Sequence, residues 1–202
     1  MIEVIKLCKR FDNRVLFSDL SFQIQTGEFV CFSGESGKGK TTLLNMIGQL
    51  EPPTSGEIQY DGEAIGSNKE RLEFLRTKVS FIFQNFALVE GKTVAQNLAF
   101  VRKNNRRDIS MESVLARVGL VDKINEKIYT LSGGEQQRVA LARSFYKCSE
   151  IILADEPTGS LDQQNAGQVV SLLRELNAEG KTVVLVTHDE RIKRICDRTI
   201  EL

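Results

Sequence analysis

Residues 34–41, Gly-Glu-Ser-Gly-Lys-Gly-Lys-Thr, have the spacing GxxxxGK[ST] of a phosphate-binding loop. Glycines let backbone N–H groups curve around phosphate oxygens without interference from a Cβ atom. A helix that starts at the end of such a loop adds N–H donors and the positive end of its dipole. In this pattern Lys40 reaches the β- and γ-phosphates, and Thr41 holds Mg²⁺. The candidate nucleotide ligands are Gly34, Glu35, Ser36, Gly37, Lys38, Gly39, Lys40, Thr41 and Thr42.

Polar residues also follow three other apolar runs. Gln84 follows the run 79–83, Asp155 and Glu156 follow 151–154, and His188 follows 183–187. If these runs are parallel strands of one sheet, all of these side chains meet at its carboxyl edge, where open α/β folds bind ligands. Asp155 is the carboxylate expected near Mg²⁺, and Glu156 can orient and deprotonate the attacking water. Taken singly, Gln84 also fits a strand-end hydrogen bonder and His188 a capping residue.

A second candidate anion site lies at residues 131–137, Leu-Ser-Gly-Gly-Glu-Gln-Gln, just before a helical pattern. Ser132 with Gly133 and Gly134 could be an ordinary helix N-cap followed by flexible glycines. The same residues could bind a phosphate with a hydroxyl and helix N–H groups. One lysine-bearing loop and one separate anion-binding helix start indicate two half-sites, which two copies arranged head to tail would complete.

Positioning these residues requires strands that alternate with helices. Short apolar runs at 2–7, 28–32, 78–83, 150–154 and 182–187 predict strands, and 41–49, 110–118, 135–148 and 164–178 predict helices. Asp61-Gly62 predicts a hairpin between 56–60 and 64–65. The fold class expected is α/β: a phosphate-loop NTPase core with a mostly parallel sheet, an N-terminal antiparallel β part and a helical insertion. Residues 1–202 then form one domain, with a core at 1–84 and about 147–202 and a helical subdomain at about 85–146.

Composition narrows the function classes. Charged residues are 27% and apolar residues 41% of 202 residues, as in soluble globular domains. The chain has 27 basic and 27 acidic residues, and this balance disfavours a nucleic-acid binder. No run of 18 apolar residues is present, which predicts no membrane-spanning helix. The four cysteines are expected to be small buried residues in a reducing compartment: Cys8, Cys31, Cys148 and Cys196.

These motifs, in this order, resemble the ATP-binding cassette (ABC) ATPases over essentially the whole chain. The resemblance includes the phosphate loop, Gln84, the Leu-Ser-Gly-Gly-Glu signature, Asp155-Glu156-Pro157, Ser160-Leu161-Asp162 and Thr187-His188-Asp189. Residues 83–97 and 154–162 are most similar to cassettes for lipoprotein release, macrolide export, cell division and export of antimicrobial peptides or bacteriocins. Two departures are Lys38, in place of a small residue, and Phe11, in place of the commoner tyrosine.

The resemblance implies an ATPase that uses ATP and Mg²⁺, and it implies a role for each matched residue. Phe11 stacks on adenine, Thr41 and Gln84 coordinate Mg²⁺ with Asp155 nearby, and Glu156 is the general base. His188 contacts the γ-phosphate and water. Across a homodimer, Ser132 and Gly134 act on the partner's γ-phosphate, and Asp162 links the two sites.

The implied function is an ATP-hydrolysing subunit that energises a membrane transporter of peptides, lipoproteins or antimicrobial compounds. It would lie at the inner face of a bacterial cell membrane, held there by a permease, with no nucleic-acid partner. Apolar residues at 85–89 and 98–100 either dock that permease or are buried in the helical insertion. The alternatives are an ATPase of a cell-division or signalling membrane complex that moves no substrate, a DNA-repair-type ABC ATPase, and an ATP-binding module that does not hydrolyse. The presence of both Glu156 and His188 disfavours the last of these.

Overall fold

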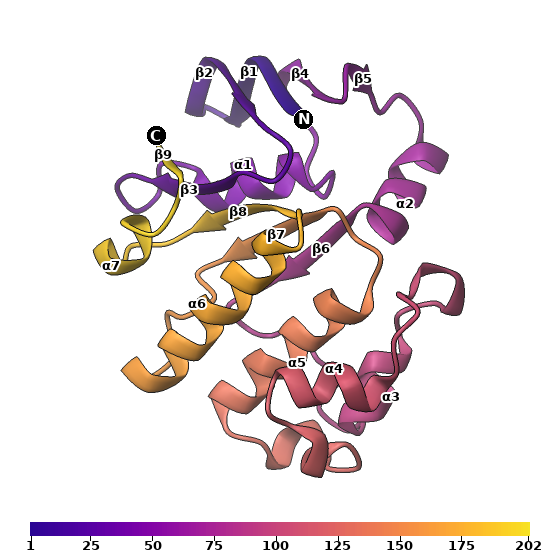
Figure 1. Cartoon of the computed structure of the whole chain (residues 1–202). Helices are drawn as coiled ribbons and strands as arrows, with labels where there is room; N and C mark the ends of the chain where they lie inside the picture. Colours follow the sequence, from indigo (N-terminus) through magenta and orange to yellow (C-terminus); the bar gives the residue numbers. More distant parts are fainter.

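The computed structural model describes residues 1–202, which form two sheets with helices between and beside them (Figure 1). The larger sheet has five parallel strands in the order β6-β7-β8-β3-β9. Their bounds are β3 Phe29–Ser33, β6 Val79–Ile82, β7 Ile151–Asp155, β8 Thr182–Val186 and β9 Arg198–Glu201. The mostly parallel sheet predicted from the sequence is confirmed.

The central strands of this sheet bury both of their faces. Along β8, Val183 and Leu185 belong to one hydrophobic core and Val184 and Val186 to the other, on the opposite face. A strand covered on both sides needs apolar residues at every position. This is the physical reason why the apolar runs in the sequence show so little alternation.

The smaller sheet is antiparallel, with the strand order β2-β1-β4-β5. Its strands are β1 Ile2–Phe11, β2 Arg14–Ile24, β4 Ser55–Tyr60 and β5 Glu63–Ala64. Asp61 and Gly62 form the expected tight turn between β4 and β5, with φ angles of 53° and 84°. Helix α1 (Lys40–Ile47) lies between the two sheets, and its buried Leu43, Met46 and Ile47 fill the core that they share (Figure 1).

Most remaining helices form the part of the molecule below the parallel sheet in Figure 1. They are α3 Val94–Ala99, α4 Met111–Arg117 and α5 Gly133–Tyr146, with 3₁₀ turns at η1 Lys103–Asn105, η2 Val121–Lys123 and η3 Ile128–Thr130. No strand lies between β6 and β7 in the chain, as expected for a helical insertion. Helices α2 Asn68–Thr77, α6 Gln163–Ala178 and α7 Glu190–Lys193 complete the fold.

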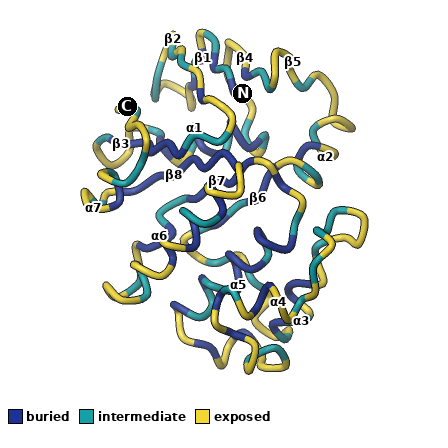
Figure 2. Tube along the Cα trace, in the orientation of Figure 1, coloured by how far each residue is buried: buried dark blue, intermediate teal, exposed yellow.

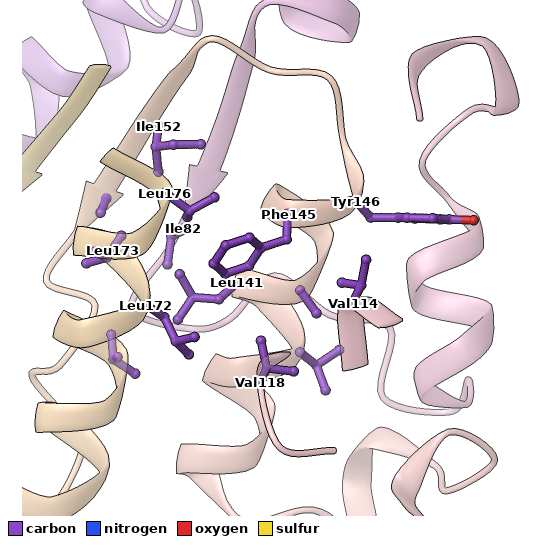
Figure 3. Packing of buried hydrophobic residues seen from close by; sticks show 14 of the residues in the cluster. Ile82, Val114, Val118, Leu141, Phe145, Tyr146, Ile152, Leu172, Leu173 and Leu176 are labelled. Carbon is purple, nitrogen blue, oxygen red and sulfur yellow. The ribbon is translucent and has the colours of Figure 1, made fainter. Parts of the chain in front are cut away.

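The helical insertion is fixed to the sheet by a continuous apolar core. Phe145 and Leu141 of α5 lie between the strands β6 and β7 on one side and Val114 of α4 on the other (Figure 3). Leu172, Leu173 and Leu176 of α6 close the same cluster (Figure 3). In Figure 2 both the strands of the parallel sheet and much of α5 are coloured as buried. The signature helix α5 is therefore packed against the strands that end at the candidate site.

Several elements were not predicted from the sequence. Strand β2 is continuous but irregular at Asp19, where φ is 53°. The pairing register with β1 shifts there, so apolar and polar residues do not alternate regularly along the strand. Helix α2 begins at Ser67, which forms a capping box with Glu70. That spacing, a serine three residues before a glutamate, is a signal that the sequence carries. The edge strand β9 is short and mostly exposed, and its sequence therefore has little hydrophobic pattern.

The expectation that all four cysteines are buried is wrong. Cys31 is buried on β3, Cys8 and Cys196 are partly buried, and Cys148 is exposed. Cys148 follows the end of α5, where the chain turns at the surface, so its position does not depend on hydrophobic burial. None of the four forms a disulfide. No helix combines the length and the hydropathy that crossing a membrane requires.

Candidate active site

The loops after β3, β6, β7 and β8 leave the same edge of the parallel sheet, because these strands are adjacent and run in one direction. The phosphate loop follows β3, and Gln84 follows β6. Asp155 ends β7 with Glu156 directly after it, and His188 comes two residues after the end of β8. The predicted convergence of these four signals at one edge is confirmed.

The phosphate loop is closed around its own lysine. The Lys40 ammonium donates hydrogen bonds to the carbonyl oxygens of Gly34 and Glu35, each at 2.8 Å, and the residue is only 6% exposed. Gly37 and Gly39 have φ angles of 80° and 94°, which side chains rarely allow, and Gly39 caps α1. The glycines at these two positions therefore permit the turn that brings the Lys40 amine beneath the loop.

Thr41 and Asp155 form the second part of the site. The Thr41 hydroxyl donates to Asp155 Oδ1 at 3.0 Å, linking the start of α1 to the end of β7. Burial raises the pKa of Asp155 above its ordinary value, against the opposing effects of the Thr41 hydrogen bond and the Lys40 charge. A hydroxyl and a carboxylate this close form a hard oxygen donor set. Mg²⁺ is commonly held by one or two such groups together with substrate phosphates, so these residues fit a magnesium ion.

Glu156 and His188 form the third part of the site. His188 Nε2 lies 3.1 Å from Glu156 Oε1, which is buried and makes no hydrogen bond. Burial raises the pKa of Glu156, and the nearby Asp155 adds to this, whereas His188 opposes it. Glu156 therefore carries a carboxylate of raised pKa, and its buried Oε1 lies against the His188 ring.

The backbone of Glu156 is also strained. Its φ of 45° lies in the left-handed region, which costs a residue with a side chain on the order of 1–3 kcal/mol. The Glu156 N–H donates to the carbonyl of Val186 on β8 at 3.0 Å, which holds the turn against the neighbouring strand. The sheet thus fixes Glu156 beside the phosphate loop at an energetic cost.

Most of these groups line one pocket of about 420 Å³, and Asp155 lies just outside its lining. The predicted residues in its wall are Phe11, Ser36, Gly37, Gly39, Lys40, Thr41, Thr42, Glu156 and His188. Phe11, at the end of β1, is 46% exposed, and the Lys9 ammonium lies 4.6 Å from the centre of its ring. The outer face of an exposed aromatic ring at the mouth of a phosphate site is suited to stacking on a base.

We expect Phe11→Ala to raise the Kd for ATP by about 5- to 100-fold, because base–aromatic stacking contributes roughly 1–3 kcal/mol. Phe11→Tyr keeps the ring and should bind ATP as the wild type does. Titration with a fluorescent ATP analogue checks both variants. An unchanged Kd in Phe11→Ala would rule out stacking on this ring.

We expect His188→Ala to move the acid limb of the pH–kcat profile to higher pH. The base works ionised, so the rate rises as pH increases through the pKa of Glu156. That pKa is already raised by burial, and His188 holds it down, so removing His188 raises it further. Initial rates of phosphate release across pH, each normalised to that variant's own maximum, measure the shift. An acid limb that stays in place or moves to lower pH would contradict the effect of His188 on the pKa of Glu156.

Besides Asp155 and three residues of the phosphate loop, five predicted residues do not line the pocket. Gln84 is exposed and lies beside Gly159, and Asp162 caps helix α6 by accepting from the Asn165 N–H at 2.9 Å. Ser132 caps helix α5, which begins at Gly133 and Gly134, and none of the three lines the pocket. The Ser132 hydroxyl oxygen accepts from Glu135 N–H at 3.3 Å, which leaves its own proton free to donate. Ser132 is exposed, so an anion can reach this helix start from another molecule.

Gly34, Glu35 and Lys38 are the phosphate-loop residues that lie outside the pocket lining. The carbonyls of Gly34 and Glu35 hold Lys40, and the exposed Lys38 ammonium lies 3.7 Å from a Glu35 carboxylate oxygen. Sequence reasoning missed Arg14, Leu16 and Val186, which line the pocket. Arg14 donates to the Gly37 carbonyl at 2.7 Å. No motif marks it, and its only sequence signal is a basic residue close after Phe11.

A parallel sheet with a phosphate loop, a hydroxyl–carboxylate pair suited to Mg²⁺ and a glutamate of raised pKa at its carboxyl edge is the arrangement of a phosphate-loop nucleotide-binding fold. A model of the family described as ABC transporter matches residues 17–159. That match covers more than half of the chain, and relatives described below are about 39% identical over nearly all of it. The chain therefore belongs to the ABC transporter family.

Relatives and solved structures agree with this assignment. An uncharacterized ABC transporter ATP-binding protein of Methanocaldococcus jannaschii is 39% identical over 93% of this chain and 87% of its own length. The macrolide export ATP-binding/permease protein MacB of Campylobacter jejuni is 38% identical over 100% of this chain. The chain spans 33% of that protein's length. A dimeric cassette, MJ0796, in a post-hydrolysis state bound to ADP and phosphate, superposes with a TM-score of 0.86 at 35% identity, covering 100% of this chain and 94% of that one.

Proposed function

We propose that this cassette hydrolyses Mg-ATP to drive a membrane transporter, with two copies closing on two ATP molecules. The observation that supports the proposal is that one copy carries two separate parts of the site on different surfaces. Lys40 and Glu156 share one pocket, whereas the helix start at Ser132 lies outside it and faces solvent. A second copy placed head to tail brings its own Ser132 to the open side of the pocket. The dimeric state of the related MJ0796 cassette supports this arrangement.

Within one copy, we propose a role for each of the matched residues. Phe11 stacks on the base, and Lys40 with the loop amides holds the phosphates. Thr41, Asp155 and Gln84 hold Mg²⁺, which neutralises charge on the phosphate oxygens when bound. Glu156 takes a proton from the attacking water, and His188 orients that water.

The proposed roles across the dimer belong to residues outside the pocket. Ser132 donates its hydroxyl proton to the partner copy's nucleotide, and the N–H groups of Gly133 and Gly134 add the positive end of the α5 dipole. Gly134 has no room for a side chain, because a Cβ there would lie 2.2 Å from Asn165 Oδ1. Asp162 caps α6 close to this contact and carries the signal between the two sites.

We propose that the single domain 1–202 has two functional parts. Residues 1–84 and about 147–202 form the nucleotide-binding core, and residues about 85–146 form the helical subdomain that carries the signature. The strand-free stretch between β6 and β7 supports this division. Both parts share the apolar core around Phe145, so movement of one part relative to the other is transmitted through packed side chains (Figure 3).

The proposed cargo is an antimicrobial compound, peptide or lipoprotein, and the proposed location is the inner face of the cell membrane. Similarity to the MacB proteins, which carry macrolide export in their name, supports this cargo class. The permease would dock in a groove of about 340 Å³ beside the Gln84 loop, lined by Phe83, Ala87 and Phe100 among others. Phe100 is 57% exposed there, which is unusual for so large an apolar side chain.

To test this function, the chain is co-expressed with permeases from the same genome, and the complex is reconstituted in vesicles. We expect co-purification and an increase in ATPase rate of at least severalfold, both lost in Phe100→Asp because a carboxylate in an apolar contact must be desolvated. The matched control is Tyr129→Asp, at an equally exposed aromatic residue on η3. A permease that neither binds the wild type nor stimulates it would contradict the transport function.

A further inference from the structure

Helix α5 carries a partly buried arginine, Arg143, that holds the Gln84 loop. Arg143 donates from Nη1 to the Ala87 carbonyl at 2.8 Å and from Nη2 to the Phe86 carbonyl at 3.0 Å. No carboxylate lies within ion-pair distance of it. Burial lowers the pKa of Arg143, as expected for a cation taken out of water. Because such a cation is costly to bury without partners, the two carbonyls are what keep it in place.

The loop that Arg143 holds is strained at the same two residues. Phe86 and Ala87 have φ angles of 63° and 47°, and both carry side chains. Consecutive left-handed residues other than glycine are rare, and they persist only where the surroundings impose them. The Phe86 N–H donates to the Phe83 carbonyl at 3.0 Å, so the turn encloses Gln84. Arg143 thus binds the C-terminal end of the turn that contains Gln84.

Two more side chains of the same helix region contact the neighbouring loops. Gln137 donates to the Pro157 carbonyl, directly after Glu156, at 2.9 Å, and its buried Oε1 has no partner. Lys147, at the end of α5, donates to the carbonyls of Leu75 and Val79, where β6 begins. The helix that starts with the signature is therefore bonded to the loops that carry both Gln84 and Glu156.

We propose that Arg143 is a positioning residue that makes the Gln84 loop follow the signature helix α5. It touches no substrate. It fixes where Gln84 lies relative to Asp155 and Glu156, and it ties that position to the orientation of α5. The inference rests on the proposed function, in which Gln84 serves the magnesium site and α5 engages the nucleotide of a second copy.

The test is Arg143→Lys, which keeps the charge but cannot bond two carbonyls with one planar group. We expect kcat to fall about tenfold, as losing one charged hydrogen bond implies, while KM for ATP stays within about twofold. Hydrogen–deuterium exchange of residues 84–90 should become about tenfold faster, with the rest of the sheet unchanged. A purely structural arginine would not change exchange in this loop alone.

The matched control is Arg106→Lys. Arg106 also donates to two backbone carbonyls, those of Val101 at 2.7 Å and Ala99 at 3.0 Å, and it makes no hydrogen bond to residues 84–90. We expect wild-type kcat and wild-type exchange at 84–90 in this variant. An equal loss of kcat in both variants, or normal exchange at 84–90 in Arg143→Lys, would overturn the proposal.

If Arg143→Lys does not fold, Ala87→Val strains the same turn from the loop side with Arg143 intact. Ala87 is exposed, and a β-branched residue resists a φ of 47°. The same lowered kcat and faster exchange are expected, and wild-type values for both would overturn the proposal. Exchange is measured without hydrolysis, so an inactive wild type would contradict the proposed function and leave the exchange result to decide on Arg143.

Discussion

Replacing Glu156 with glutamine should reduce phosphate release by about 10²- to 10⁴-fold, the usual contribution of a general base. Glutamine has the same shape but cannot accept the proton of the attacking water. ATP binding should remain, because the phosphates are held by Lys40 and the loop amides. With hydrolysis blocked, ATP should then trap a closed dimer that elutes earlier than the monomer in size-exclusion chromatography.

The thermal stability of Glu156→Gln provides a further check on the environment of this residue. Burial raises the pKa of Glu156, which means that its ionised form is disfavoured where it lies. A neutral amide is less costly to bury, so Glu156→Gln should not lower the melting temperature. The matched control is Glu35→Gln, at an exposed glutamate of the phosphate loop, which should hydrolyse ATP normally. Undiminished hydrolysis in Glu156→Gln would exclude Glu156 as the base.

Replacing Lys40 with methionine should raise the Kd for Mg-ATP by about 10- to 100-fold, because a charged hydrogen bond contributes roughly 1.5–3 kcal/mol. Methionine keeps the apolar stem of lysine and removes only the ammonium group. The same ammonium holds the carbonyls of Gly34 and Glu35 in the absence of nucleotide, so we also expect the loop to become more mobile. Isothermal titration calorimetry measures the change in affinity.

The phosphate loop contains its own control for this experiment. Lys38 lies two residues before Lys40, but its ammonium is exposed and lies 3.7 Å from the Glu35 carboxylate. Lys38→Met should change the Kd by less than about twofold, since an exposed charge is screened by water. Equal losses from the two substitutions would mean that both lysines bind phosphate, and the distinct role given to Lys40 would be wrong.

The sequence predicted correctly those features that depend on the spacing and polarity of neighbouring residues in the chain. The glycine and lysine spacing of the phosphate loop specifies its own turn and the helix that follows. The apolar runs around Ile152 and Val184 have no polar positions, so only strands covered on both faces suit them. Because such strands are parallel in this kind of fold, their polar ends had to meet at one edge. Asp155, Glu156 and His188 could be placed together on that basis.

The tertiary structure alone decided what depends on contacts between distant segments. Arg14 enters the nucleotide pocket because β1 and β2 form a hairpin beside Gly37, a proximity that no spacing in the chain encodes. Ser132 lies outside the pocket because α5 packs on the parallel sheet through Phe145. Arg143 holds the Gln84 loop because the packing of α5 brings its guanidinium within hydrogen-bond distance of two carbonyls of a strained turn. Local propensity governs a turn or a helix, whereas these positions result from the packing of whole elements.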